Sequence, residues 1–200
     1  ILITLDKDYY KKKLQYKFIE DQMEISRSVA ELIAQGKVIS WFQGKMEFGP
    51  RALGNRSILA DPRNPKMKDI INLKVKRRES FRPFAPVVLR EYQHEWFESD
   101  YFNSYMSSVV RVKENKKVLV PAITHIDNTA RLQTVTEKSH KHFYELLTEF
   151  GKISETNVLL NTSFNIRGLP ILSTIEDALY ALQNTEMDYV IIEDYLFSKL

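Results

Sequence analysis

The stretch that organises the chain is QGKMEFGPRALGNRSILADPR, residues 43–63. It contains three of the six glycines in the sequence and three arginines. Glycine lets the backbone turn sharply and approach a ligand closely, and arginine offers a planar fork of donors that suits phosphate and carboxylate oxygens. Apolar residues at 41–42 and 58–60 flank the polar part, which is therefore expected to be a loop between two buried anchors. The pattern predicts an anion-binding loop whose cations include Arg51 and Arg56.

A surface turn with ordinary ion pairs is the alternative for this stretch, because glycine, proline and arginine also serve turns. No GKS or GKT follows the glycines, and the spacing GxGxxG is absent. A Walker loop and a dinucleotide-binding fingerprint are therefore both excluded here.

The composition suits one domain with its own core, since 44% of the 200 residues are hydrophobic and 28% are charged. A net charge of +3 is too small for a general nucleic-acid binder, although a local basic cluster can still hold a small anion. The absence of cysteine excludes disulfides, thiolate catalysis and zinc–thiolate sites. No membrane-length apolar run and no signal peptide are visible, so we expect a cytoplasmic protein without membrane contact. The start at Ile1 suggests a fragment of a longer protein.

Alternating helices and strands are expected, which favours an α/β or mixed α+β class. Apolar residues at helical spacing predict helices over 19–35 and 139–150, ended by Gly36 and Gly151. Further helices are expected from Pro65, over 91–97, and from a capping box at Ser173 and Glu176 through Leu182.

The helix from Pro65 is expected to bury Met67, Ile70, Ile71 and Leu73. Strands are predicted over 38–42, 87–89, 106–112, 118–120, 131–135, 157–160 and 189–192, with a further short strand or linker over 1–5.

A second basic group follows the helix predicted from Pro65 and comprises Lys76, Arg77, Arg78 and Arg82. Cations at a helix C-terminus often only complement the helix dipole and remain solvated, which is the interpretation for Arg77 and Arg78. Lys76 and Arg82 differ, because the proline and phenylalanine residues around Arg82 would hold it against the body of the domain.

A third group is THIDNTAR, residues 124–131. His125 and Asp127 could be a metal pair or an acid–base pair, and a structural histidine is the simpler alternative. Neither a third ligand nor a spacing of the HExxH type is present, so no metal site is predicted. Arg131, at the start of a predicted strand, is the stronger candidate.

The fourth group is NTSFN, residues 161–165, which follows a predicted buried strand. Ligand loops in α/β sheets lie at the carboxyl ends of strands, and hydroxyl and amide groups can donate to phosphate or carbamate oxygens. A turn into the next helix is the alternative. No base is identifiable beside Ser163, so we expect a hydrogen-bond donor rather than a nucleophile.

Four blocks resemble, in the same order, the C-terminal domain of the carbamoyltransferases related to the nodulation and aminoglycoside-antibiotic enzymes. The resemblance covers the chain from Val38 onward and is weak before Glu31. It implies a YrdC-like twisted sheet with flanking helices over 37–200, preceded over 1–36 by a linker remnant and an N-terminal helix. The blocks are GKMEFGPRALGNRS (44–57), DPRNPKMKDIINLKVKRRESFRPFAP (61–86), PAITHIDNTARLQTV (121–135) and LLNTSFNIRGLPI (159–171).

The resemblance implies the adenylate-forming half of an O-carbamoyltransferase. In this family, the domain binds ATP and carbamoyl phosphate. Carbamate released from carbamoyl phosphate attacks the α-phosphate of ATP, which gives carbamoyl-adenylate and pyrophosphate. A metal-binding N-terminal domain then passes the carbamoyl group to an acceptor hydroxyl, whose identity these residues do not specify. Mg²⁺ is expected with the ATP phosphates, and no protein ligand for a metal is assigned.

The family's motif positions give the candidate residues their roles. Phosphate-binding positions match Arg51, Lys76, Arg82 and Arg131, and a Ser-x-Asn motif matches Ser163 and Asn165. Several fixed cations can hold two mutually repelling polyanions and stabilise the charge that develops at phosphorus. The catalytic candidates are Lys76, Arg82 and Ser163, and the substrate- and ATP-binding candidates are Arg51, Arg56, Arg131, His125, Asn161 and Asn165.

Two residues depart from the family pattern. Lys45 stands where arginine is usual, which keeps the charge but loses the fork, and Leu169 stands where an acidic residue is common. The rival hypothesis is a non-catalytic YrdC-like module that binds nucleotide or RNA, since relatives of this fold include tRNA-modification factors. The small net charge and the lack of an aromatic and basic strand motif argue against RNA.

Overall fold

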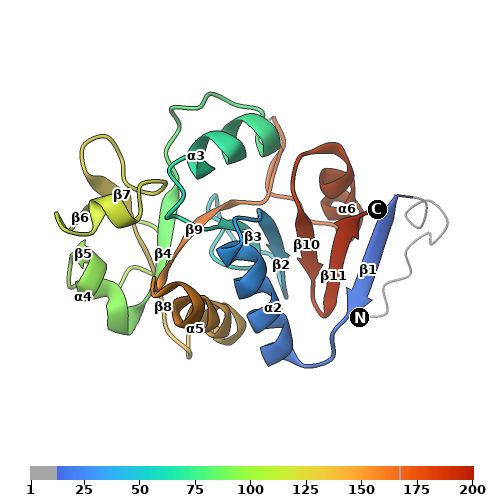
Figure 1. Ribbon diagram of the computed structural model, residues 1–200, viewed down its shortest axis with the longest axis horizontal. Helices are drawn as coiled ribbons and strands as arrows, with labels where there is room; N and C mark the ends of the chain where they lie inside the picture. Colours follow the sequence, from blue (N-terminus) through green and yellow to red (C-terminus); the bar gives the residue numbers. More distant parts are fainter. Residues whose placement is uncertain (1–12, 167) are drawn as a thin grey trace.

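The computed structural model describes residues 13–166 and 168–200, which form two sheets with flanking helices (Figure 1). The large sheet contains β1 (Leu14–Phe18), β2 (Ile39–Phe42), β3 (Arg56–Ala60), β4 (Ala85–Leu89), β8 (Gln133–Val135), β9 (Val158–Ser163), β10 (Tyr189–Ile192) and β11 (Tyr195–Lys199). Its strand order is β1-β11-β10-β2-β3-β9-β4-β8. A three-stranded sheet consists of β5 (Phe97–Glu98), β6 (Val109–Val112) and β7 (Thr129–Arg131). The fold is mixed α+β, as the sequence predicted.

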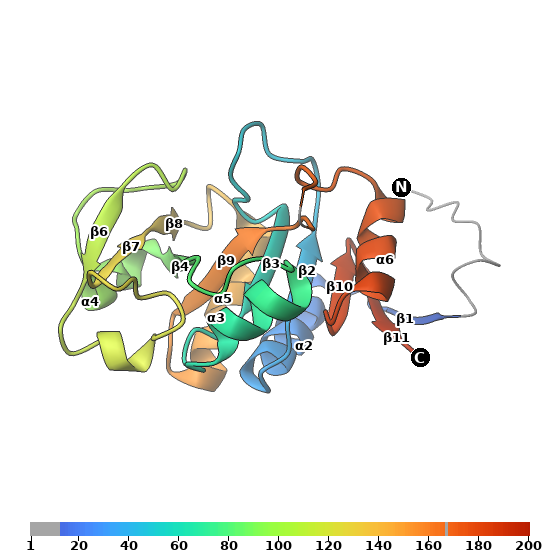
Figure 2. The same cartoon turned by 90° about the horizontal axis from the view of Figure 1, so that it is seen from above.

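Helices cover both faces of the large sheet (Figures 1 and 2). One face carries α2 (Gln22–Ala34) and α5 (Lys141–Ser154), and the other carries α6 (Ile175–Asn184) together with α3 (Met67–Asp69), which continues as a π-helix over Ile70–Val75. Shorter helical segments are Arg90–Tyr92, α4 (Gln93–Trp96) and Lys117–Leu119.

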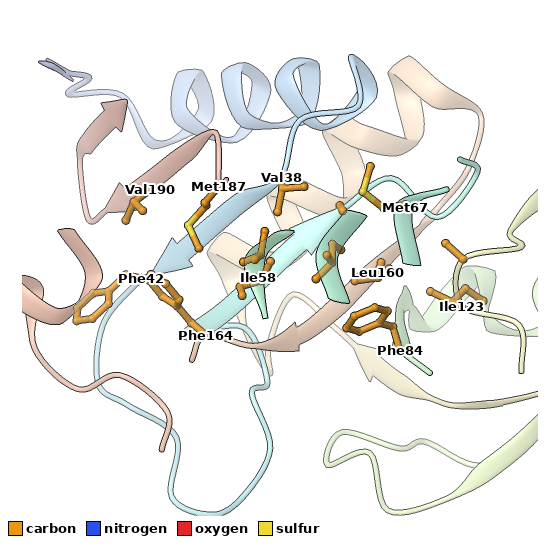
Figure 3. Close-up of a cluster of buried hydrophobic side chains, with 14 of the residues drawn as sticks. Val38, Phe42, Ile58, Met67, Phe84, Ile123, Leu160, Phe164, Met187 and Val190 are labelled. Carbon is orange, nitrogen blue, oxygen red and sulfur yellow. The ribbon is translucent and has the colours of Figure 1, made fainter. Parts of the chain in front are cut away.

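The two faces of the sheet have separate cores because successive side chains of a strand point to opposite faces. Ile58 and Leu160 lie in the core under α3 and α6, which Figure 3 shows in close-up. Leu59 and Leu159, one position along each strand, lie in the core under α2 and α5. Five consecutive strands of the sheet, up to the edge strand β8, are buried at every position apart from the carboxyl end of β9: β2, β3, β9, β4 and β8.

The helix predicted over 19–35 is confirmed as α2. The Asp21 carboxylate accepts a hydrogen bond from the Met23 amide at 2.9 Å, and the chain leaves the helix through Gly36 at φ +84°. The strands predicted around β2, β4, β9 and β10 are also confirmed.

Gly151 does not end α5, contrary to the prediction. The helix continues to Ser154, and Glu155 takes the left-handed conformation that ends it. Gly151 is needed for space instead, since a Cβ there would lie 1.9 Å from the Asn157 Oδ1 atom. The N-cap of α6 is likewise Thr174 rather than Ser173, and its hydroxyl accepts from the Asp177 amide.

The π-helix changes which residues face the core. Met67 and Ile71 are buried as predicted, but the Leu73 side chain is 57% exposed. The prediction assumed 3.6 residues per turn, whereas the wider turn moves later residues around the axis. Val75 and Lys76 consequently point inward.

Other predictions were wrong at short elements. Residues 117–119 form a 3-10 turn rather than a strand, and the strand predicted over 131–135 is divided between β7 and β8, which belong to different sheets. The sequence also did not predict β11 as a separate strand after β10. The segment 1–5 lies outside the described residues.

All four candidate segments converge on one end of the large sheet. β9 runs antiparallel to β3 and β4, with Ser57 opposite Ser163 and Ala85 opposite Asn161. β9 therefore ends where β3 and β4 begin. Because β2 is antiparallel to β3 and β8 is parallel to β4, the end of β2 and the start of β8 lie there too.

Candidate functional site

The glycine loop (residues 43–55) joins β2 to β3 and is organised by a glutamate. Oε1 of Glu47 accepts hydrogen bonds from the backbone N–H groups of three residues later in the chain: Leu53 at 2.7 Å, Asn55 at 2.8 Å and Arg56 at 3.1 Å. Glu47 is buried, whereas Arg51 between these contacts is exposed. The loop therefore folds around a carboxylate and presents an arginine outward.

Arg56, one of the predicted substrate-binding candidates, makes contacts that hold the loop together. Its Nη1 atom donates to the Gln43 and Asn55 carbonyl oxygens, both at 2.9 Å, and its Nη2 atom donates to the Gly44 carbonyl oxygen at 3.0 Å. The guanidinium also lies over the Phe42 ring, 3.4 Å from its centroid. Burial lowers the pKa of Arg56, with Glu47 opposing this effect. These contacts join the two ends of the loop.

Asn161 also contacts the loop from below. Its Nδ2 atom donates to the Ala52 carbonyl oxygen at 3.2 Å and to Gln133 Oε1 at 2.7 Å, and Gln133 in turn donates to the Leu53 carbonyl oxygen at 2.8 Å. These bonds tie the loop to β9 and β8. Asn161 therefore links the loop to the large sheet beneath it.

Arg51 and Arg131 come together from separate segments. Arg131 is the last residue of β7, and burial followed by repulsion from Arg51 lowers its pKa. The Arg131 Nε atom is buried and has no hydrogen-bond partner within the part of the chain that the structure describes. An anion bound near Arg131 would relieve this repulsion, so the electrostatics here favour a negatively charged ligand.

His125 borders this arginine pair as a neutral hydrogen-bonding residue. Its Nε2 atom lies 3.3 Å from the Phe84 carbonyl oxygen, and its Nδ1 atom lies 3.3 Å from the Thr129 hydroxyl. The carbonyl can only accept, so Nε2 carries the proton in this arrangement. Burial is the main reason that the His125 pKa is lowered, and Arg131 contributes. Asp127 is exposed and caps a turn through Thr129.

Lys76 contacts the Ser-x-Asn segment directly. Its Nζ atom donates to the Ser163 carbonyl oxygen, to Ser163 Oγ at 3.3 Å and to Asn165 Oδ1 at 2.6 Å. Only 3% of Lys76 is exposed, and burial together with repulsion from Arg78 lowers its pKa well below the usual range. The structure thus brings together a lysine and a serine that are far apart in the sequence.

Asn72 positions the segment that leads from Lys76 to Arg82. Its Nδ2 atom donates to the Ser80 and Arg82 carbonyl oxygens at 3.1 and 2.9 Å, and its Oδ1 atom accepts from Arg78 Nε at 2.7 Å. The Arg82 side chain is half exposed and pairs with Glu79 at 3.0 Å. Arg77 faces elsewhere and donates to the Asn184 carbonyl oxygen of α6 at 2.6 Å.

Sequence reasoning identified the cations of the site but missed its supports, which include Glu47, Asn72 and Gln133. Of these supports, Glu47 had the clearest signal in the sequence, because it is the only acidic residue inside a basic loop. Arg63, the third arginine of the opening stretch, lies beyond the other end of β3. There it pairs with Asp61 at 2.6 Å and takes no part in the site.

Across residues 13–166 and 168–200, no group of three or more His, Asp or Glu side chains could hold a metal ion. In the same residues, none of the helices combines the length and the apolar character needed to cross a membrane. A cavity of about 670 Å³ lies beside the small sheet, and its lining includes residues of β5 and β6 but none of the candidate site residues.

A family model described as carbamoyltransferase C-terminus matches residues 30–199. The nodulation protein NolO of Bradyrhizobium diazoefficiens is 46% identical over 90% of this chain and 34% of its own length. The 3'-hydroxymethylcephem-O-carbamoyltransferase of Streptomyces clavuligerus is 35% identical over 86% of this chain and 33% of its own length. The chain thus spans about a third of the length of these relatives.

Solved structures with lower sequence identity share the fold. Sua5 of P. abyssi, complexed with L-threonine, has a TM-score of 0.60 at 16% identity, covering 85% of this chain and 47% of that protein. Full-length HypF in its phosphate- and nucleotide-bound form has a TM-score of 0.57 at 16% identity, covering 88% of this chain and 24% of that protein. The predicted YrdC-like architecture is therefore confirmed.

Proposed function

Because the chain belongs to the carbamoyltransferase C-terminus family, we propose that it forms carbamoyl-adenylate from ATP and carbamoyl phosphate. The observation that carries this proposal is the convergence of four segments at one end of the sheet. These segments carry Arg51, Lys76, Arg82 and Arg131, and Lys76 contacts Ser163 and Asn165 directly.

The proposed reaction has two steps. Water first cleaves carbamoyl phosphate to carbamate and inorganic phosphate. A carbamate oxygen then attacks the α-phosphorus of ATP, a new P–O bond forms, and the bond from the α-phosphorus to the bridging oxygen breaks. The electron pair leaves with pyrophosphate. Fixed cations favour this step because they stabilise charge on the phosphoryl oxygens in the transition state.

The contacts suggest a division of labour. Arg51 and Arg131 already repel each other, so a phosphate group would lower the energy of both. Lys76 and Ser163 form a compact polar unit that suits the carbamate end of the reaction, with Ser163 as a hydrogen-bond donor. Arg82 is half exposed and can swing from Glu79 to a bound phosphate.

Mg²⁺ fits this proposal as part of the ATP substrate complex. The side chains that converge on the site are mostly cationic, and they suit phosphate oxygens better than a metal ion. A divalent ion would lower the charge of the triphosphate and help pyrophosphate to leave. Transfer of the carbamoyl group to an acceptor hydroxyl would then belong to another domain of the full-length protein.

The test is pyrophosphate release from MgATP, with and without carbamoyl phosphate, in the wild type and in Arg82→Ala. We expect release that requires carbamoyl phosphate and falls on the order of a hundredfold in the variant, as for the loss of one transition-state donor.

Arg77→Ala is the matched control, because this neighbouring arginine contacts α6 instead of the site. It should release pyrophosphate within about twofold of the wild type. Saturable MgATP binding without release would restrict the chain to a nucleotide-binding role. RNA binding that weakens steeply with salt, with no release, would support the rival nucleic-acid module instead.

A further inference from the structure

We propose that Glu47 is the positioning residue of the anion site, acting on Arg51 through the backbone of the glycine loop. The inference rests on the proposed function for the identity of the anion, a nucleoside triphosphate. Glu47 itself would not touch the substrate. Its role would be to fix the backbone of the loop from which Arg51 extends.

The geometry gives Glu47 control over the second half of the loop. One carboxylate oxygen receives three backbone N–H groups, from Leu53, Asn55 and Arg56, all within 3.1 Å. Arg51 lies between Glu47 and these amides in the sequence, so the hydrogen bonds constrain the backbone both before and after the arginine. Hydrogen bonds to a charged oxygen are roughly twice as strong as neutral ones.

Burial makes this arrangement hard to replace. Glu47 is about 9% exposed, and its other oxygen, Oε2, is buried without a hydrogen-bond partner among the described residues. Removing the carboxylate would leave three amides without their acceptor in a partly buried place. Unsatisfied buried donors are costly, so the loop would open to reach water.

The other supports hold different parts of the loop. Asn161 donates to the Ala52 carbonyl oxygen and Gln133 donates to the Leu53 carbonyl oxygen. His140 contacts the Asn55 side chain. None of these groups accepts from the three amides bound by Glu47. Loss of Glu47 should therefore free the amides while the carbonyl side of the loop stays attached, which would misplace Arg51 without unfolding the domain.

The experiment measures MgATP affinity by calorimetry in the wild type, Glu47→Ala and Glu47→Gln. Misplacement of a functional group by about 1 Å can lower a reaction rate up to a hundredfold. For the misplaced Arg51 we expect Glu47→Ala to weaken MgATP binding by roughly tenfold or more. Glu47→Gln keeps the shape and one neutral acceptor, and it should recover most of the affinity. Hydrogen exchange should show lost protection at Leu53, Asn55 and Arg56 in Glu47→Ala.

A double-mutant cycle separates positioning from general stability. In an Arg51→Ala background the arginine is already absent, so adding Glu47→Ala should change MgATP affinity less than twofold. Glu193→Ala is the matched control, because Glu193 Oε1 accepts from the Gly44 amide at 2.9 Å, at the start of the same loop. This control should bind MgATP within about threefold of the wild type.

Three results would overturn the inference. Glu47→Ala could bind MgATP as well as the wild type, the two substitutions could prove additive, or Glu193→Ala could weaken binding as much as Glu47→Ala. Wild-type MgATP binding without carbamoyl-phosphate-dependent pyrophosphate release would instead reject only the proposed reaction. A wild type that binds no MgATP would reject both.

Discussion

Lys76 is a cation in a place that disfavours charge. Burial and the nearby Arg78 lower its pKa, yet its Nζ atom faces three oxygen acceptors, which is the number an ammonium group can satisfy. Two of these acceptors have a second donor, since Ser163 Oγ donates to Asn165 Oδ1 and the Asn165 backbone amide donates to the Ser163 carbonyl oxygen, and Ser163 Oγ itself still takes part as a donor. The lysine is therefore dispensable for local hydrogen bonding.

Lys76→Met should lose activity without losing stability. We expect pyrophosphate release to fall at least about a hundredfold, because one fixed cation is gone. Thermal unfolding should occur at the same or a higher temperature, because replacing a buried charge with an apolar side chain of similar volume is often neutral or stabilising. Lys74→Met is the control, since Lys74 is exposed and paired with Glu186; it should leave turnover within about twofold.

The same substitution should remove a pH dependence. The Lys76 pKa is lowered in the folded state, so the unfolded chain binds more protons between that pKa and the usual value of 10.5. The free energy of unfolding of the wild type should therefore rise with pH through this window. Urea titrations at several alkaline pH values should show this rise in the wild type and a flatter profile in Lys76→Met. Parallel profiles would contradict the lowered pKa.

Among the elements, the contact between the glycine loop and α5 limits what the loop can accept. Gly54 has φ +113°, and a Cβ there would lie 2.4 Å from the ring of Phe143, which is fully buried. Gly49 in the same loop has φ +126° but meets nothing within 4 Å. Both positions require a positive φ, but only Gly54 lacks room for a side chain.

Gly54→Ala should destabilise the protein by roughly 3 kcal/mol, which combines backbone strain with overpacking against Phe143. Gly49→Ala should cost only the strain, about 1–2 kcal/mol. Urea unfolding of the two variants measures the difference. Equal losses would mean that Phe143 moves aside at little cost and that α5 does not constrain the loop.

The elements that could be predicted from sequence were those with a strong local signal. α2 and the strands β2, β4, β9 and β10 have apolar runs bounded by turn residues, and they were found, whereas β3 was anticipated only as an apolar anchor of the loop. The π-helix has no such signal, because Ile70 to Val75 fit an α-helix equally well by composition. β11 was missed because it follows β10 after only two residues and only one of its five residues, Phe197, is buried.

For the whole molecule, β1 joins the large sheet at the edge farthest from β9 and β4. It pairs with β11, Leu14 lying opposite Lys199, and Leu14 is 6% exposed in the core shared with α6. Phe18 and Tyr195 also pack across this pair, with ring centroids 5.1 Å apart. Stability at this edge is thus separated from the site by the intervening strands.

Leu14→Ala should reduce the free energy of unfolding by about 2 kcal/mol, in the lower range for buried leucine. The KM for MgATP should stay within about twofold of the wild type at temperatures where both proteins are folded. Gln15→Ala, an exposed neighbour, should change neither quantity. A raised KM in Leu14→Ala would show that the edge of the sheet and the site are coupled.

The site as a whole could be predicted only in part. Arg51, Lys76, Arg131 and Ser163 were singled out chiefly because they match motif positions of the resembled family, and the fold brings their segments to one end of the sheet. Their supports could not be recognised, because a glutamate that binds three amides has the same local sequence as one in solvent. For Arg56, only the folded loop shows that its two terminal nitrogens donate to the Gln43 and Gly44 carbonyl oxygens.

The widened turn before Lys76 has an evolutionary consequence. Each residue of an α-helix advances the chain by about 100° around its axis, so the length of this segment sets the direction of the lysine. If the same six residues wound as a regular α-helix, Lys76 would point in another direction, away from Ser163, although every side chain type needed for the site would remain. Lineages of this family that lack the widened turn should therefore lack one residue of the segment as well, because only that shorter segment would keep the lysine directed at the serine.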